Sequence, residues 1–281
     1  MQSGNRVDRL LAWATGELAG SDSPRLDAEL LLADRLDKDR TWLYTWPEYQ
    51  VEPQQCLQFE KRVYRRREGE PIAYILGYRE FWSLRLEVSP ASLIPRPETE
   101  CLVERALQLD VPEQARVLDL GTGSGAIALA LASERPGWQV VAVEQNADAV
   151  AMACRNRDRL KLQVDIRRGS WFEPVQGDPP FDMIISNPPY VESNSLWLQQ
   201  GDVRFEPASA LTAGEDGLDD IRRILGDSRR YLSPVGYLIL EHGHMQGAAV
   251  RTLMQASGME RVETGFDLAG HERFCQSRKQ P

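Results

Sequence analysis

The sequence has few of the residues that build metal centres or disulfide frameworks. Its four cysteines are scattered and form no Cys-x-x-Cys pair, which argues against a zinc knuckle and against a disulfide framework. Only three histidines are present, all near the C-terminus. His242 and His244 have a spacing at which they could share a metal ion, but no third ligand follows at a suitable distance along the chain. We therefore expect no metal site and interpret these histidines as residues at the end of a strand.

Long hydrophobic runs are also missing. Residues 126–132 form one of the longest apolar runs, and it is far too short to span a bilayer. Residues 1–20 carry charges where a signal peptide would have an apolar core. With 42% apolar and 27% charged residues, the composition is that of an ordinary globular protein. We therefore expect a cytoplasmic protein, without membrane contact, that is long enough for two domains.

An excess of positive charge is lacking as well. The net charge is −9, and residues up to Arg85 carry 13 basic and 14 acidic side chains, which leaves −8 for the remainder. Proteins that grip a phosphate backbone usually present a basic face. The charge therefore favours a protein or small-molecule substrate and argues against stable binding of nucleic acid.

One basic cluster does occur near the end of the N-terminal part. It consists of Lys61, Arg62, Arg65, Arg66 and Arg67. Cations suit the negative end of a helix dipole, so a solvated helix end is the favoured interpretation. Whether the cluster contacts the substrate stays open at this point.

Residues 1–76 have the pattern of a small helical domain, and residues 77–98 that of a β-hairpin linker. Ser23 followed by Pro24 is typical of a helix start, and leucines and alanines then recur at helical spacing up to Leu36. A second amphipathic segment follows Pro53 and ends before Gly69. The linker alternates apolar residues among prolines and serines, which indicates short strands and turns.

Residues 99–281 show an alternation of strands and helices. The apolar stretches predict strands over residues 117–120, 139–143, 164–168, 183–185 and 236–241. The helical patterns cover residues 126–132, 147–157, 219–231 and 246–256. Such an alternation is typical of an α/β fold in which helices cover both faces of a mostly parallel sheet.

A glycine-rich loop directly follows the first of these strands. It consists of Gly121, Thr122, Gly123, Ser124 and Gly125. Glycines let the chain turn sharply there and let a ligand lie against bare backbone at the start of a helix. The loop therefore predicts a cofactor site at this edge of the sheet.

The identity of the cofactor is ambiguous from this loop alone. Glu144 lies at the tip of the second strand, where a carboxylate can accept hydrogen bonds from both hydroxyls of an adenosine ribose. Gly121, Gly123 and Ala126 even satisfy a relaxed dinucleotide pattern. The close Gly-x-Gly-x-Gly spacing, with Asp119 two positions earlier, favours S-adenosylmethionine over NAD.

The next motif decides between the two cofactors. Asn187, Pro188, Pro189 and Tyr190 follow the fourth strand, at the edge where open α/β sheets bind ligands. Two prolines make a rigid turn and leave carbonyl oxygens facing outward. The Asn187 side-chain oxygen and the Pro188 carbonyl can each accept one N–H of an NH₂ nucleophile, which aims its nitrogen at a sulfonium methyl group. The Tyr190 ring can cover a flat amide or base.

These motifs resemble those of methyltransferases that modify nitrogens conjugated to a π system. Within that group the chain resembles the release-factor glutamine methyltransferases, the PrmC/HemK family. The similar stretches are GYREFW at residues 77–82, LIPRPETE at 93–100, VLDLGTGSG at 117–125, SNPPY at 186–190, GDVRFEP at 201–207, EHG at 241–243 and GHER at 270–273.

The resemblance implies a class I methyltransferase fold, with Rossmann-like topology, behind the helical domain. It implies methyl transfer from S-adenosyl-L-methionine to N5 of the glutamine in the Gly-Gly-Gln motif of class-I peptide chain release factors, with S-adenosyl-L-homocysteine as product. Residues 121–125, Glu144, Trp171 and Asn187 then contact the cofactor, and residues 187–190 contact the glutamine, with Asn187 catalytic. The family commonly has Asn-Glu-Arg where this chain has His271 before Glu-Arg, so His271 is left out of the site.

Several residues keep two interpretations. Trp171 follows the third strand, either as a flat wall for adenine or as a core residue that anchors a loop. Arg204 and Glu206 either close over the substrate or pair with each other. Arg96 and Glu98, at the end of the linker, belong either to the path of the substrate or to a hinge.

Two rival functions stay open. A nucleic-acid amino-methyltransferase would use the same turn on a flipped adenine N6, but it would normally need a base-recognition insertion and a basic groove. A non-enzymatic S-adenosylmethionine-binding module would leave the Asn187 turn without a purpose. The sequence therefore favours glutamine methylation that modulates translation termination.

Overall fold

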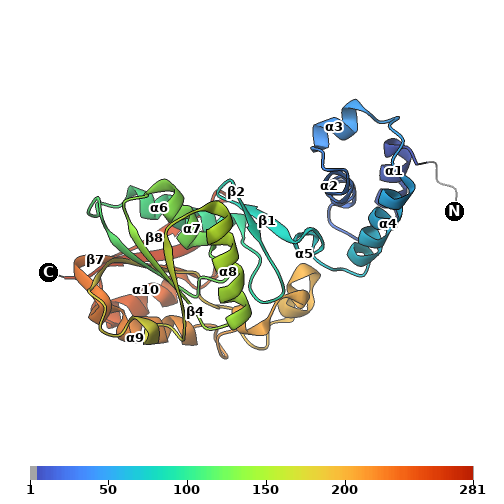
Figure 1. Cartoon of the computed structure of the whole chain (residues 1–281). Helices are drawn as coiled ribbons and strands as arrows, with labels where there is room; N and C mark the ends of the chain where they lie inside the picture. The colour runs from blue at the N-terminus through green and yellow to red at the C-terminus, as the bar shows by residue number, and fades with distance from the viewer. Residues whose placement is uncertain (1–4, 281) are drawn as a thin grey trace. The chain divides into compact units, whose positions relative to one another are not determined.

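The structure, a computed structural model, describes residues 5–280. The first four residues of the predicted helical domain and Pro281 lie outside the described residues. The chain forms two compact units (Figure 1). The helical unit contains the residues up to Gly77 together with Gln199–Phe205, and the sheet unit contains Tyr78–Leu198 and Glu206–Pro281.

Within residues 5–280, five α-helices belong to the helical unit. They are α1 (Val7–Glu17), α2 (Pro24–Leu36), α3 (Arg40–Thr45), α4 (Pro53–Arg67) and α5 (Ile72–Leu76). Pro24 is the first residue of α2, as predicted, because a proline there gives up an N–H that has no partner within the helix. The Ser23 side chain does not cap this helix and instead donates to Asp27 Oδ1 at 3.1 Å. Leu10, Leu31 and Phe59 are fully buried between α1, α2 and α4.

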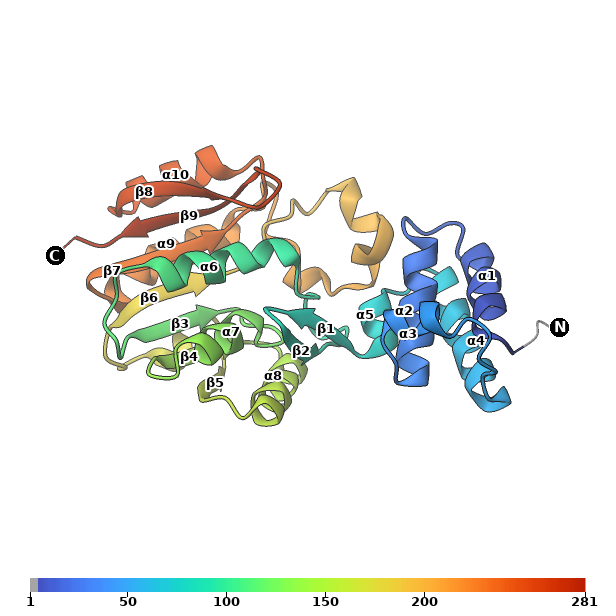
Figure 2. The same cartoon turned by 90° about the horizontal axis from the view of Figure 1, so that it is seen from above.

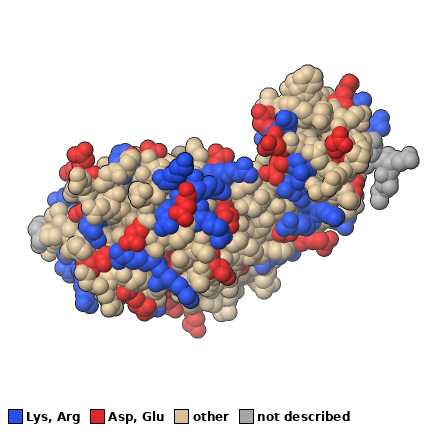
Figure 3. Space-filling model, in the orientation of Figure 1, with Lys and Arg blue, Asp and Glu red and all other residues tan. Residues whose placement is uncertain are grey.

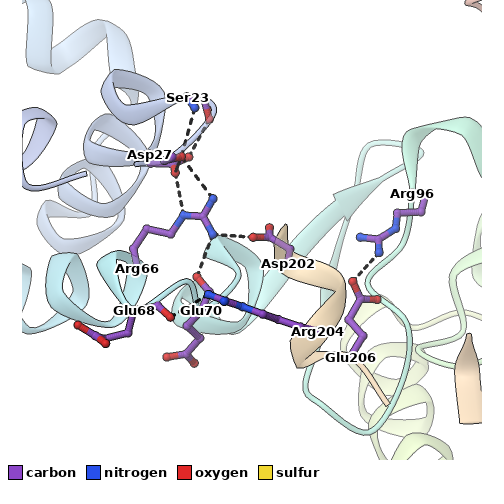
Figure 4. A network of polar contacts seen from close by, with 10 residues as sticks. Ser23, Asp27, Arg66, Glu68, Glu70, Arg96, Asp202, Arg204 and Glu206 are labelled. Carbon is purple, nitrogen blue, oxygen red and sulfur yellow. Dashed lines mark hydrogen bonds and ion pairs between the residues drawn. The ribbon is translucent and has the colours of Figure 1, made fainter. Parts of the chain in front are cut away.

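The segment Gln199–Phe205 belongs to the helical unit although it is distant in sequence. Arg66 of α4 donates from Nη1 to Asp202 Oδ1 at 2.6 Å and from Nε to Asp27 Oδ2 at 2.8 Å (Figure 4). Arg204 donates to the Glu68 carbonyl at 3.1 Å. Its guanidinium fills the space beside Gly69, where an added Cβ would lie 1.8 Å from Nη2. The Arg204 side chain is therefore held by residues 68–69 of the helical unit.

The basic cluster on α4 is largely paired with acidic side chains. Its ion pairs are Arg62–Asp34 at 2.6 Å, Arg65–Glu70 at 2.5 Å, Arg66–Asp27 at 2.8 Å, Arg66–Asp202 at 2.6 Å and Arg67–Glu17 at 2.8 Å. In the view of Figure 3, basic and acidic side chains are interspersed over both units. Arg65 and Arg67, both 47% exposed, fit the interpretation of a solvated helix end, whereas the Arg66 side chain is 13% exposed and belongs to a buried polar network.

The linker contains a short antiparallel hairpin, β1 (Tyr78–Phe81) with β2 (Leu84–Glu87). Its two turn residues, Trp82 and Ser83, have φ values of 51° and 58°, the left-handed region that a two-residue turn of this twist requires. The strands occupy only part of the predicted range 77–98. The residues after β2 are irregular until the short 3-10 helix η1 (Pro97–Thr99).

In the part of the chain that the structure describes, seven strands form the central sheet. They are β3 (Arg116–Leu120), β4 (Gln139–Glu144), β5 (Val164–Arg168), β6 (Phe181–Ser186), β7 (Leu232–Glu241), β8 (Glu260–Phe266) and β9 (Glu272–Arg278). Their order is β5-β4-β3-β6-β7-β9-β8, and all neighbours are parallel except β9, which runs antiparallel to both β7 and β8. The predicted α/β fold with a mostly parallel sheet is confirmed.

Five longer helices belong to this unit: α6 (Glu100–Gln108), α7 (Ala126–Glu134), α8 (Ala147–Leu160), α9 (Asp219–Tyr231) and α10 (Gly247–Ala256). Successive strand residues point to opposite faces. Val117 packs in the core with α6 and α7, whereas Leu118 packs in the core with α9 and α10. In Figure 2, helix α6 lies in front of the strands of the sheet. Helix α6 was not predicted. Further 3-10 helices are η2 (Glu173–Val175), η3 (Leu196–Gln199), η4 (Gly201–Phe205) and η5 (Ala208–Ala210).

The carboxyl ends of β3, β4 and β6 meet at one edge of the sheet. The chain runs from β3 outward to β4 and β5 and then crosses to β6 on the other side of β3, which is the arrangement that opens a crevice at the strand tips. Among residues 5–280, none of the helices is both long and apolar enough to cross a membrane.

Candidate active site

A pocket lies at this edge, within the sheet unit. Its walls come from the end of the linker, the glycine loop after β3, the tip of β4, the turn after β5 and the turn after β6. Of the predicted site residues, the lining includes Gly121, Thr122, Gly123, Ser124, Glu144, Trp171, Asn187 and Pro189. Sequence segments that were singled out separately are therefore brought together by the fold.

The glycine loop depends on its glycines and on Glu144. Gly121 and Gly123 have φ values of 70° and 57°, which disfavour residues with a Cβ. Glu144 accepts from the Gly123 N–H through Oε2 at 3.0 Å and from the Asn146 N–H through Oε1 at 2.8 Å. The predicted ribose ligand thus also holds the loop in shape.

Gly125 does not line the pocket, although it was predicted among the cofactor contacts. Its φ is 88°, and an added Cβ would lie 2.9 Å from Leu129 Cδ1 and 3.5 Å from the Ala153 side chain. The residue immediately precedes α7 and permits close packing against α8. The glycine at position 125 is therefore explained by the turn before α7 and by the contact of α7 with α8.

Asp119 is a site residue that the sequence used only to choose between cofactors. It is 1% exposed, and its Oδ2 accepts from the Thr122 hydroxyl at 2.5 Å and from the Ala128 N–H at 3.2 Å. Burial raises the pKa of this carboxyl to about 7, opposed by those two hydrogen bonds and assisted by the charge of Glu144. Oδ1 is buried and without a hydrogen-bond partner among the described residues, in a side chain that lines the pocket.

Trp171 lies against the glycine loop. Its ring carbon Cζ3 is 3.7 Å from the position of a Cβ at Gly121. Its own φ is 48°, an uncommon backbone conformation for a bulky side chain. The half-buried ring forms part of the pocket wall and also packs against the core with α9 and α10, so its position agrees with both interpretations.

The turn after β6 places Asn187 at the pocket and Tyr190 behind it. Ser186 ends the strand and donates to the Leu120 carbonyl at 2.7 Å, which ties the tips of β6 and β3 together. Asn187 Nδ2 donates to Thr99 Oγ1 at 3.1 Å. Pro188 is buried, and Pro189 lines the pocket. Pro188 and Tyr190, two of the four predicted substrate contacts, do not line it.

Glu241 is a buried carboxyl behind this turn that sequence reasoning did not assign to the site. It ends β7, is 1% exposed, and accepts from the Tyr190 hydroxyl through Oε1 at 3.2 Å. Burial raises the pKa of Glu241 to about 7, and the nearby Thr99, Arg273 and Tyr190 side chains oppose that rise. Burial and the charge of Glu241 in turn raise the pKa of Tyr190.

The end of the linker is fixed by Glu206. This carboxylate is 7% exposed; it accepts from the Ile94 N–H at 3.1 Å and from Arg96 through a short ion pair (Figure 4). Arg96 lines the pocket, whereas Glu98 is exposed. Arg96 and Glu206 therefore hold the strip of chain that forms one pocket wall.

The histidines lie apart from the pocket lining. His242 is fully buried after β7, and its ring contacts the Gly243 carbonyl at 2.9 Å and Cys275 Sγ at 3.4 Å. Burial lowers the pKa of His242. The side chain of His271 is 60% exposed. Within residues 5–280, no cluster of three or more potential ligands is arranged to hold a metal ion.

Comparisons with known proteins connect this site to one family. A family model described as the PrmC N-terminal domain matches residues 9–77, and one described as the methyltransferase small domain matches residues 98–208. A solved methyltransferase from Pyrococcus furiosus has the same fold, with a TM-score of 0.55 at 19% identity over 79% of this chain and 100% of that chain.

Two bacterial relatives are much more similar. The release factor glutamine methyltransferase of Pseudomonas aeruginosa is 55% identical over 259 residues, which are 92% of this chain and 94% of the relative. That of Salmonella typhimurium is 50% identical over 269 residues, or 95% and 97% of the two chains. At this identity and coverage, the chain belongs to the release factor glutamine methyltransferase family.

Proposed function

We propose that this protein transfers the methyl group of S-adenosylmethionine to the side-chain amide nitrogen of the glutamine in the Gly-Gly-Gln motif of class-I peptide chain release factors. The observation that carries the proposal is the position of Asn187. Its side chain stands at a pocket built from the glycine loop and Glu144, and its Nδ2 is already engaged by Thr99. The Asn187 oxygen is therefore the end of the amide that remains for a substrate N–H.

The pocket residues fit the chemistry of the methyl donor. Glu144 retains lone pairs for ribose hydroxyls beside the two N–H groups it accepts. The Trp171 ring offers a flat apolar wall for adenine. The unpaired Oδ1 of Asp119 suits an ammonium group, because a buried carboxylate needs a cation or donor to offset its desolvation. When bound, the donor supplies an electrophilic methyl group on a positively charged sulfur.

The residues of the turn orient the nucleophile. The Asn187 oxygen accepts one N–H of the substrate amide, and the Pro188 carbonyl accepts the other. Both acceptors stand on a stretch of chain whose φ angles are fixed by two prolines. This holds the nitrogen lone pair toward the donor, and orientation of this kind supplies a large part of a rate enhancement. No base is required before attack, since the nitrogen can lose its proton afterwards.

The test compares Asn187→Ala with Asn194→Ala, which changes an exposed asparagine in the next loop. Loss of one orienting group costs about 2.7–4 kcal/mol by analogy with oxyanion-hole donors, which corresponds to roughly 10²- to 10³-fold in kcat. We expect that loss in Asn187→Ala, near-normal affinity for S-adenosylhomocysteine, and normal turnover in Asn194→Ala. Wild-type turnover in Asn187→Ala would refute the role of this residue.

The substrate class needs its own test. Wild-type enzyme is incubated with labelled donor and either purified release factor or plasmid DNA, and the products are analysed by mass spectrometry. We expect label on one glutamine of the release factor and none on DNA. Label on adenine N6 would favour the rival nucleic-acid function, and transfer to neither substrate would leave a binding module.

The helical unit (predicted as the domain of residues 1–76) is assigned to binding of the protein substrate. None of its described residues lines the pocket, and it exposes Tyr44, Trp46 and Tyr49 by 57%, 57% and 47%. Three exposed aromatics within six residues are typical of an interaction surface.

We expect the Trp46→Ser, Tyr49→Ser double variant to raise KM for the release factor but not for the donor. The control is Leu268→Ser, which changes an equally apolar, fully exposed residue of the sheet unit.

A further inference from the structure

An asparagine can take part in this reaction in only one of its two orientations. Its side chain has an acceptor oxygen and a donor NH₂ group that are nearly equal in size. If the NH₂ group faced the substrate amide, two donors would meet and the nucleophile would not be aligned. Some other group must therefore decide which end of Asn187 faces the pocket.

Thr99 is the residue that contacts the other end. It is 4% exposed, belongs to η1 and accepts from Asn187 Nδ2 at 3.1 Å. A hydroxyl can also donate, however, and a donating Thr99 would instead hold the Asn187 oxygen and turn the amide around. The orientation of Asn187 thus depends on where the Thr99 proton goes.

Glu241 provides the acceptor for that proton. Ser186 pairs with Leu240 in the parallel register of β6 and β7, so the next residues along the two chain segments are Asn187, just after β6, and Glu241, the last residue of β7. The Thr99 side chain approaches the Glu241 carboxylate closely enough to lower its pKa. Oε1 accepts from Tyr190, while Oε2 is buried, has no hydrogen-bond partner among the described residues and is the acceptor left for Thr99.

The surroundings of Glu241 include groups of both charges. Arg273 on β9 and the Tyr190 phenol favour the ionised carboxylate, whereas burial and Glu98 on η1 disfavour it. Cys101 on α6 is also near, since the charge of Glu241 contributes to raising the pKa of that thiol to about 12. Arg273 is itself held by Asp267 at 2.9 Å. The carboxylate is thus poised between its two protonation states at neutral pH.

We propose that Glu241 and Thr99 are positioning residues that set the orientation of Asn187. The ionised Glu241 accepts the Thr99 proton, Thr99 can then only accept from Asn187 Nδ2, and Asn187 Oδ1 faces the pocket. Tyr190 on the same carboxylate holds the far end of the turn. This inference rests on the proposed role of Asn187 in transfer.

Protonation of Glu241 reverses the direction of the hydrogen bonds that link Glu241, Thr99 and Asn187. A protonated Glu241 donates to Thr99, whose own proton is then free to bind the Asn187 oxygen. Because the pKa of Glu241 lies at about 7, kcat at saturating donor falls as the pH drops below that value. The Asp119 carboxyl titrates in the same range, but it lies on the donor side of the pocket and affects KM for the donor.

Kinetics of three variants test the inference. Thr99→Val keeps the shape but cannot accept from Asn187, so we expect kcat to fall roughly 5- to 150-fold, the effect of an unsatisfied buried donor. Thr99→Ser should stay near wild type, and Glu241→Gln should lose the acid limb of the kcat profile. The control is Ser228→Ala, which removes a buried hydroxyl of α9 that bonds the Leu225 carbonyl. Wild-type kcat in folded Thr99→Val, or an unchanged profile in Glu241→Gln, would overturn the inference.

A second measurement does not depend on activity. The side-chain NH₂ signal of Asn187 in a ¹⁵N spectrum is identified by its absence in Asn187→Ala. We expect that signal to shift with a midpoint near pH 7 in the wild type and to be insensitive to pH in Glu241→Gln; an identical titration in both would overturn the inference. If the signal behaves as expected but the wild type does not methylate release factor, the proposed function fails while the orientation mechanism stands.

Discussion

Arg66 joins two carboxylates that are far apart in the chain: its Nε donates to Asp27 Oδ2 and its Nη1 to Asp202 Oδ1, 136 residues away. The Asp27 side chain is only 5% exposed and also accepts from the hydroxyls of Ser21 and Ser23. One side chain thus completes a buried polar network and holds the segment Gln199–Phe205 in the helical unit.

Removal of Arg66 should therefore destabilise the protein far more than removal of its neighbour. Breaking a buried pair leaves an uncompensated charge, and we expect Arg66→Ala to lower the free energy of unfolding by about 3 kcal/mol. Arg65→Ala removes an exposed pair with Glu70 and should cost less than about 1 kcal/mol. Urea unfolding followed by circular dichroism measures both. Equal losses would mean that the network around Asp27 rearranges without cost.

Binding of the cofactor should release a proton from Asp119. The pKa of its carboxyl lies at about 7 in the folded protein, against 3.8 ordinarily, because the side chain is buried. The protonated form therefore stabilises the free protein, and this contribution is lost as the pH rises through about 7. An ammonium group at Oδ1 would favour the ionised form, so affinity for S-adenosylhomocysteine should rise with pH over the same interval.

Calorimetry at pH 6.5 in buffers of different ionisation enthalpy counts the protons released. Asp119→Asn can still accept from Thr122 and Ala128 through its remaining oxygen, and we expect it to release fewer protons than the wild type. If the two proteins release the same number, the proton comes from another group and Asp119 does not face the ammonium.

Glu144→Ala should weaken cofactor affinity without much effect on saturated turnover. The carboxylate holds the glycine loop through Gly123 and is assigned to the ribose, which lies away from the transferred methyl group. Loss of a charge-assisted hydrogen bond costs about 1.5–3 kcal/mol, or roughly 10- to 150-fold in affinity. Titration with S-adenosylhomocysteine gives the dissociation constant, and an unchanged value would remove Glu144 from the binding site.

The target glutamine should receive only one methyl group. An unmodified amide has two N–H groups, one for Asn187 Oδ1 and one for the Pro188 carbonyl, and the product retains a single N–H. A second transfer would leave a buried acceptor unpaired, which costs about 1–3 kcal/mol or roughly 5- to 150-fold in rate. Tandem mass spectrometry after long incubation with excess donor detects the product. A substantial dimethylated population would contradict the two-acceptor geometry.

The parts of the fold that the sequence predicted well depend on local pattern. The strand at Val117, the glycine turn after it and the helix from Ala126 each follow from neighbouring residues, and the structure places them as expected. Helix α6 escaped prediction because it begins directly after a proline-rich stretch. Its three buried positions, Leu102, Val103 and Ala106, are also too few to show a helical period clearly.

The parts that the sequence could not predict depend on distant contacts. In the sequence, Glu241 has the pattern of an ordinary residue at the end of a strand. It is buried behind Asn187 because β7 pairs with β6 on one side and with β9 on the other. Gln199–Phe205 reads as part of a long loop, because nothing near Asp202 indicates that its partner is Arg66. Burial and pairing of such charges are properties of the assembled structure.

The membership of Gln199–Phe205 in the helical unit also has a topological consequence. The chain passes between the two units three times, at Gly77, at Leu198 and at Phe205. A single cut by a protease after Gly77 would leave the helical unit hydrogen-bonded to a stretch of polypeptide from the other fragment. The helical unit is therefore not complete in the residues up to Gly77. If these residues were fused to another protein, Arg66 would lose its partner Asp202. The space beside Gly69 would also lose the Arg204 side chain that fills it.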